Sequence, residues 1–277
     1  MSHHAFIAVT TQPVPYHADT TAIFNTLCNH PNTLLLDSAE IGSKNSLQSL
    51  ILINAAVKIS CLGHNVTFKA LNANGKQVLK EIQPILTALA QSKGSERAVN
   101  FDDKFSVDFA PLDNQLDEDS KLQSATIFDG LRVISNLYQH SQTPVFLGGL
   151  FAYDLVANFI PMNGIALKDD GIHCPDYSFY LAEHLITIDH QSQQATLKSF
   201  CFAQEEQVNV AKTALSIAQN LKNIDNVLSI KSASDEVKTN FDDPEFTGIV
   251  KALKHHINIG DVFQIVPSRR FSLACPN

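Results

Sequence analysis

Hydrophobic and polar positions follow two periods along this chain, and each period predicts a type of element. Apolar residues at helical spacing predict helices over residues 19–29, 78–89, 128–137, 205–221 and from 243 to a stop at Gly260. Alternating or short apolar runs predict strands over residues 33–38, 145–153, 177–188 and 192–203, and a hairpin over 49–71 that turns at 63–65. Because strands and helices mix without a strict βαβ rhythm, we expect an α+β fold with mixed or antiparallel sheets and packed helices.

Three segments are predicted to interrupt this pattern. Asn72-Ala73-Asn74-Gly75 has the composition of a turn. Pro84 stands inside the next helix and should kink or divide it, because proline lacks the N–H that a helix interior needs. Residues 92–122 are polar and acidic, which predicts an exposed excursion rather than packed core.

The last segment, residues 260–273, has the alternation of a half-buried strand, with Phe263, Ile265 and Phe271 at apolar positions. A strand needs a paired edge, because unpaired backbone groups are costly when buried. We therefore expect the helix from Asp243 and this strand to open a second domain whose remainder is absent. The predicted organisation is a first domain over 1–222, a linker over the polar residues 223–240, and a truncated second domain over 241–277.

Composition narrows the class of protein. The formal net charge is −8 and the arginines are few, which argues against nucleic-acid binding. No apolar run approaches the length that spans a membrane, and the N-terminus lacks the pattern of a secretory signal. The five cysteines are far apart and form no C-x-x-C pair, which predicts small buried side chains in a reducing cytoplasm rather than disulfides or a zinc site.

Four places carry candidate chemistry. Residues 36–40 put two carboxylates and a hydroxyl just past a predicted buried strand, which suits either the ammonium of an amino acid or a local cap or turn. Gln264, an amide in an apolar strand, is either a structural bridge or a site residue. Gly148-Gly149 fits a sheet bulge or a phosphate cradle, and residues 173–176 fit a loop with a buried thiol or a Cys–His site.

Four motifs in this order closely resemble anthranilate synthase component I, of the chorismate-utilising enzyme family. They are LLLDSAEI at 34–41, GGLFAYDL at 148–155, CPDY at 174–177 and FQIVPSRRFS at 263–272. The resemblance runs through nearly the whole chain, which covers about half of that family's usual length. It implies the family's αββα sandwich, only partly present here.

The resemblance also implies a reaction, partners and site residues. The family converts chorismate and ammonia, supplied from glutamine by a glutaminase subunit, into anthranilate and pyruvate. It uses a magnesium ion, whose ligands are expected in the missing C-terminal half, and tryptophan inhibits it by binding in the N-terminal domain. The effector-binding positions implied are Ser38, Asp37 and Leu36, although Asp37 stands where the family more usually has glutamate. Gln264 corresponds to a wall of the active site, where a neutral amide suits ammonia as the nucleophile.

The predicted function is thus the N-terminal, tryptophan-sensing portion of a cytoplasmic lyase, inactive as a fragment because the metal ligands are missing. Two alternatives stay open. One is the related aminodeoxychorismate synthase component I, whose distinguishing motifs lie beyond Asn277. The other is a stand-alone amino-acid-binding regulatory module without catalysis.

Overall fold

The computed structural model describes residues 5–39, 46–92, 98–111, 115–160, 174–224 and 237–273. The chain divides into two compact units, residues 1–226 and residues 227–277. The division falls inside the segment predicted as a linker, most of which lies outside the described residues. The α+β class is confirmed, because the paired strands are antiparallel and helices pack on the sheet of the first unit.

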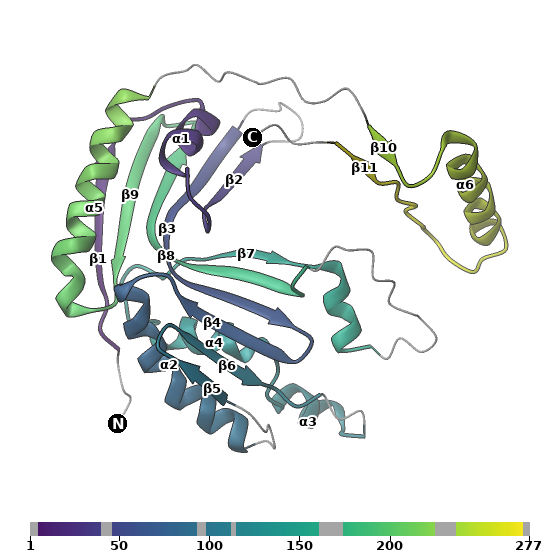
Figure 1. The fold of residues 1–277 in the computed structure, drawn as a ribbon, viewed down its shortest axis with the longest axis horizontal. Coiled ribbons are helices and arrows are strands. Elements are labelled where there is room, and N and C mark those ends of the chain that lie inside the picture. The colour runs from purple at the N-terminus through teal and green to yellow at the C-terminus, as the bar shows by residue number, and fades with distance from the viewer. Residues whose placement is uncertain are drawn as a thin grey trace. The chain divides into compact units, whose positions relative to one another are not determined.

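The first unit is built on one antiparallel sheet in which nine described strands take part. The hydrogen-bonded order is β1-β9-β8-β3-β4-β6-β5, with β2 added beside β3 and β7 added beside β8 (Figure 1). The strands are β1 (Ala8–Val14), β2 (Leu34–Ala39), β3 (Ser46–Leu62), β4 (Asn65–Ala70), β5 (Ala98–Phe101), β6 (Lys104–Asp108), β7 (Leu147–Phe151), β8 (Tyr177–Asp189) and β9 (Gln194–Cys201).

The two long central strands, β3 and β8, each carry two neighbours in succession along their outer edge. On β3 the first neighbour is β2 and the second is β4; on β8 the neighbours are β7 and then β9. The β3–β8 pairing shifts register between Leu52 and Val57, at the junction of these two halves. Bulges increase local bending and twist, and the sheet curls strongly in Figure 1.

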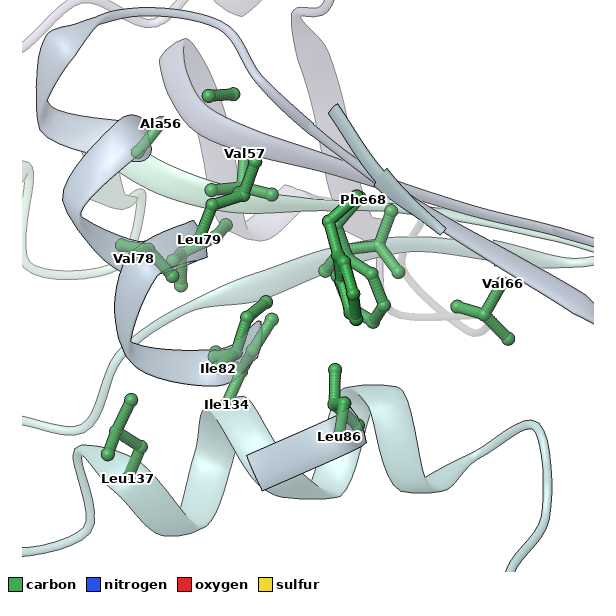
Figure 2. Packing of buried hydrophobic residues seen from close by; sticks show 14 of the residues in the cluster. Ala56, Val57, Val66, Phe68, Val78, Leu79, Ile82, Leu86, Ile134 and Leu137 are labelled. Atoms are coloured by element: carbon green, nitrogen blue, oxygen red, sulfur yellow. The ribbon is translucent and has the colours of Figure 1, made fainter. Parts of the chain in front are cut away.

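Helices cover each half of the sheet and create two hydrophobic cores. The helices are α1 (Thr20–Leu27), α2 (Ala73–Ser92), α3 (Glu118–Gln123), α4 (Asp129–Leu137) and α5 (Gln207–Asn220), with 3₁₀ turns at Tyr153–Asn158, Gln204–Glu206 and Leu221–Asn223. In the larger core, α2 and α4 present Ile82, Leu86 and Ile134 to Phe68 and Val66 on β4 (Figure 2). In the smaller core, Ile23 of α1 and Ile217 of α5 pack with Ile51 and Ile186 of the sheet.

The segment predicted as a turn, Asn72 to Gly75, is instead the start of α2. The Asn72 Oδ1 accepts a hydrogen bond from the Gly75 N–H at 2.8 Å, the geometry of a helix N-cap. Asparagine favours turns and helix caps for the same reason, since its side chain can satisfy nearby N–H groups. Pro84 does not divide α2: Pro84 and Lys80 are both exposed, so the carbonyl without an N–H partner lies on the solvent side.

The prediction of an exposed excursion over 92–122 is wrong for its central part. Strands β5 and β6 form a hairpin there and extend the sheet through β4. Phe105 and Val107 of β6 are fully buried in the larger core. Of the described acids in this segment, Asp102 and Asp103 form the turn between these strands, Asp108 ends β6, and the others lie at the start of α3.

The second unit contains α6 (Asp243–Asn258) and a short ladder between β10 (Lys238–Thr239) and β11 (Phe271–Ser272). Helix α6 begins at Asp243 as predicted, and its N-cap Asp242 forms a capping box with Glu245. Gly260 follows the helix with a φ of 82°, as its predicted stop requires. The long strand predicted over 260–273 is wrong: only Phe271 and Ser272 pair, and Phe263 is fully exposed.

Candidate functional site

The hydroxyl-plus-acid motif lies on β2, which is an edge strand among the described residues and is not the buried strand predicted. Its pairing partner in the described residues is β3, with Asp37 opposite Ser49 and Ser38 opposite Gln48. Leu36 is 41% exposed, and Asp37 and Ser38 are exposed as well. The register shifts between Ser38 and Ala39, which fits the irregular end of a strand.

Strand alternation sends Asp37 and Ser38 to opposite faces of the sheet. Leu35 packs into the smaller core with α1 and α5, and Asp37 lies on the same face. Leu34 packs into the larger core instead, and Leu36 and Ser38 share its face. The sequence motif therefore separates in space into a helix-facing acid and a hydroxyl on the other face.

On the helix-facing side, Asp37 belongs to a polar group. The buried Thr20 hydroxyl of α1 donates to the Asp37 Oδ2 at 3.1 Å. Beside it, the fully buried Ser49 lies 2.8 Å from the Nε2 of His190, and the Nδ1 of His190 lies 3.2 Å from the Tyr16 hydroxyl.

The opposite face of β2 carries exposed polar and apolar side chains side by side. Ser38 and Gln48 are exposed cross-strand partners, and Leu36 pairs with the half-buried Leu50. A hydroxyl and an amide supply donors and acceptors, and the leucines supply apolar surface. This combination suits a small ligand with a charged or polar end and an apolar side chain.

Several residues of this site are absent from the sequence prediction. Gln48, Thr20, Ser49 and His190 join it only through strand register and helix placement. The alternation of β3 puts Ser49 on the face of Ile51, but no local pattern tells which histidine reaches it. Glu40, the second carboxylate of the motif, lies outside the described residues.

Gln264 lies in the second unit, away from any regular strand. The prediction of an amide inside an apolar strand is wrong, because Gln264 is exposed and residues 262–270 have no assigned pairing. Five residues further along the chain, the Arg269 guanidinium pairs with Asp243 and lies 4.9 Å from the centre of the Phe271 ring. The role of Gln264 in an active-site wall stays a prediction.

In the other candidate motifs the described residues make structural contacts, and His173 lies outside the described residues. A Cβ at Gly149 would overlap the Ser178 carbonyl oxygen and lie 2.6 Å from the Phe179 Cα, so this glycine serves close strand approach. Asp176 accepts hydrogen bonds from the Gly63 N–H at 2.6 Å and the Asn158 amide at 3.0 Å, which anchors the β3–β4 turn. Cys174 is exposed, so the thiol predicted as buried is not; Cys28, Cys61 and Cys201 are buried as predicted.

Two kinds of feature are absent from the described part of the chain. There, no group of three His, Cys, Asp or Glu side chains is arranged to hold a metal ion. Among the same residues, no helix is both long and apolar enough to cross a bilayer.

Comparison with known proteins gives a consistent match. The family model described as chorismate binding enzyme matches residues 84–277. Anthranilate synthase component 1 of Haemophilus influenzae is 87% identical over 274 residues, which are 99% of this chain and 52% of that protein. The proteins of the same name from Vibrio cholerae and Escherichia coli are 44% and 38% identical, each over 95% of this chain and 50% of their own length.

This chain thus spans about half the length of the curated relatives that it matches. Among solved structures, anthranilate synthase component I from Streptococcus pneumoniae aligns with a TM-score of 0.48 and 16% identity, over 91% of this chain and 46% of that one. The resemblance inferred from the four motifs is confirmed by the sequence matches.

Proposed function

Because this chain belongs to the family of chorismate-binding enzymes, we propose that it is the N-terminal portion of anthranilate synthase component I. The observation that carries the proposal is the 87% identity to a protein of that name over 99% of this chain. The complete enzyme then converts chorismate and ammonia into anthranilate and pyruvate in tryptophan biosynthesis. A glutaminase subunit supplies the ammonia, and the enzyme works in the cytoplasm.

The proposal places the chemistry mainly outside this chain. The magnesium ligands are proposed to lie in the part of the enzyme that this chain does not cover, in line with the absence of a metal-binding cluster among the described residues. Magnesium, when bound, would supply Lewis-acid stabilisation of charge on the substrate. From this chain, the neutral amide of Gln264 would line the chorismate site and leave ammonia to act without a general base.

The proposed role of the first unit is regulatory. Tryptophan combines an ammonium and a carboxylate with an apolar ring, and the exposed face of β2 offers complementary groups. The Ser38 hydroxyl and the Gln48 amide would bind the polar end, and Leu36 and Leu50 would contact the ring. Asp37 lies on the other, helix-facing side of β2, where its carboxylate accepts a hydrogen bond from the Thr20 hydroxyl.

Product analysis tests the proposed activity. The complete enzyme is the longest polypeptide that the gene encodes. It and the 277-residue chain are incubated separately with chorismate, magnesium and ammonium. We expect the complete enzyme to release anthranilate, detected by its fluorescence, together with an equal amount of pyruvate, and the shorter chain to release neither. Formation of aminodeoxychorismate without pyruvate would overturn the proposed reaction, and product from the 277-residue chain would overturn the placement of the chemistry.

A further inference from the structure

Asp37 is the residue of the β2 motif whose surroundings fit a direct ligand role least well. Its carboxylate lies on the face of the sheet that α1 covers, whereas Ser38 lies on the other face. The Asp37 side chain is exposed, but it lies on the opposite face of the sheet from Ser38 and Gln48. Its link to Ser38 therefore runs through the backbone of β2.

The contact that holds Asp37 comes from α1. Thr20 is the first residue of this helix, and its hydroxyl is buried and donates to the Asp37 Oδ2 at 3.1 Å. The preceding residue, Asp19, caps the helix by accepting from the Ala22 N–H at 2.9 Å, which fixes the first turn that carries Thr20. A buried hydroxyl needs a partner, so the Thr20–Asp37 bond costs free energy to break from either side.

Strand β3, which pairs with β2, is held by contacts on the same helix-facing side. Ser49, directly across from Asp37, contacts His190, and His190 contacts Tyr16 from the segment before α1. The backbone N–H of His190 also donates to the Leu47 carbonyl oxygen at 3.1 Å. Strand β3 is therefore held independently of Thr20, whereas the end of β2 pairs only with β3 among the described residues and has an irregular register.

We propose that Thr20 is a positioning residue for the effector site: its hydrogen bond to Asp37 fixes the end of β2 and so sets the place of Ser38 relative to Gln48. Asp37 acts as the acceptor of this bond and does not bind the effector's ammonium. This inference rests on the proposed regulatory function. It assigns the acid beside Ser38 to strand placement, for which an oxygen acceptor is needed and a negative charge is not.

Tryptophan inhibition of the complete enzyme tests the inference. Thr20→Val removes the hydroxyl at nearly constant shape, and we expect it to raise the half-inhibiting tryptophan concentration about tenfold, the equivalent of one strong hydrogen bond. Thr20→Ser restores the hydroxyl and should return inhibition to within about twofold of the unmodified enzyme. Turnover without tryptophan should be unchanged in both variants. Thr26→Val is the matched control, because the Thr26 hydroxyl bonds only to the Ala22 carbonyl of its own helix.

Asp37→Asn separates the two roles of the acid, because it keeps an oxygen acceptor for Thr20 but removes the charge. We expect inhibition by tryptophan within about twofold of the unmodified enzyme. A tenfold weaker inhibition in this variant, or unaltered inhibition in Thr20→Val, would overturn the inference. An unmodified enzyme that tryptophan does not inhibit would instead overturn the regulatory function itself. Should Thr20→Val fail to fold, Asp37→Asn and Thr20→Ser still decide between the outcomes.

Discussion

Gly75→Ala is expected to destabilise the first unit by at least about 3 kcal/mol, the upper range for overpacking in a tight core. Gly75 lies in the first turn of α2, where the helix backbone meets β3. A Cβ at this position would overlap the Ala56 carbonyl oxygen and lie 2.7 Å from the Ala56 carbonyl carbon. That carbonyl also accepts a hydrogen bond from the Leu71 N–H at 2.9 Å. If the carbonyl moved away, this bond, which holds the chain just before α2, would be lost.

Urea denaturation of the 277-residue chain, followed by far-UV circular dichroism, measures this effect. Gly248→Ala is the matched control, because Gly248 is also inside a helix but has no atom within 4 Å of its added Cβ. Alanine favours the helix there, so we expect no loss of stability and a gain of up to about 1 kcal/mol in α6. Equal denaturation midpoints for the first unit in Gly75→Ala and in the unmodified chain would show that α2 does not dock on β3 as described.

Asn74→Ala is expected to cost about 3 to 4 kcal/mol, because one side chain satisfies four buried groups. Its Nδ2 donates to the Glu183 Oε2 and to the Phe200 carbonyl, each at 2.9 Å. Its Oδ1 accepts from the Phe202 N–H at 2.6 Å and the Ala203 N–H at 3.1 Å. Alanine leaves all four groups buried without these partners.

The neighbouring carboxylate makes this site sensitive to charge. Burial raises the pKa of Glu183, and the hydrogen bonds from Asn74 and Asn72 oppose that rise by stabilising the ionised form. Asn74→Asp keeps an acceptor for Phe202 and Ala203 but puts a second acid beside Glu183, so we expect a loss at least as large as that of alanine at neutral pH. Next to Glu183, burial lowers the pKa of His184 to about 4, so its ring is neutral and supplies no compensating charge.

The same denaturation experiment provides the comparison. Asn209→Ala is the control, because Asn209 is exposed on α5 and its side-chain amide donates to the Glu206 carboxylate at 2.8 Å, away from any buried group. Its midpoint should stay within about 0.5 kcal/mol of the unmodified chain. If Asn74→Ala were as stable as Asn209→Ala, the buried network between α2 and β9 would not exist in solution.

Local sequence patterns predict some elements of the first unit and misassign others. The helix at α1 and the hairpin β3–β4 follow from local periods and caps, and both are confirmed. Asn72 to Gly75 was predicted as a turn, because asparagine and glycine favour turns and helix N-termini alike. What selects the helix start is the contact with Ala56 and Glu183, far away in the sequence.

The candidate site was predictable in part for a similar reason. The motif at residues 36–38 lies on β2, and it belongs to one of the four motifs that together carry the family resemblance. The separation of Asp37 and Ser38 onto opposite faces follows from strand alternation. The residues that lie next to each of them do not follow from it. Thr20 and Gln48 become neighbours of this strand only through the docking of α1 and the register with β3.

The alternating apolar residues near the C-terminus gave the opposite outcome. Phe263 and Ile265 have the period of a strand, but within the described residues the segment pairs only at Phe271 and Ser272. Periodicity indicates which face an element would bury, and it forms a strand only where a partner supplies hydrogen bonds.

The measurement that tests the account most directly is the tryptophan dependence of anthranilate formation by the complete enzyme with Ser38→Ala. If the exposed face of β2 binds the effector, the half-inhibiting concentration rises about tenfold or more, as loss of a hydrogen bond to a charged group requires. Ser60→Ala, in the other half of β3 opposite Thr67, is the control and should respond to tryptophan like the unmodified enzyme. Inhibition of Ser38→Ala at the same tryptophan concentration as the unmodified enzyme would contradict the account.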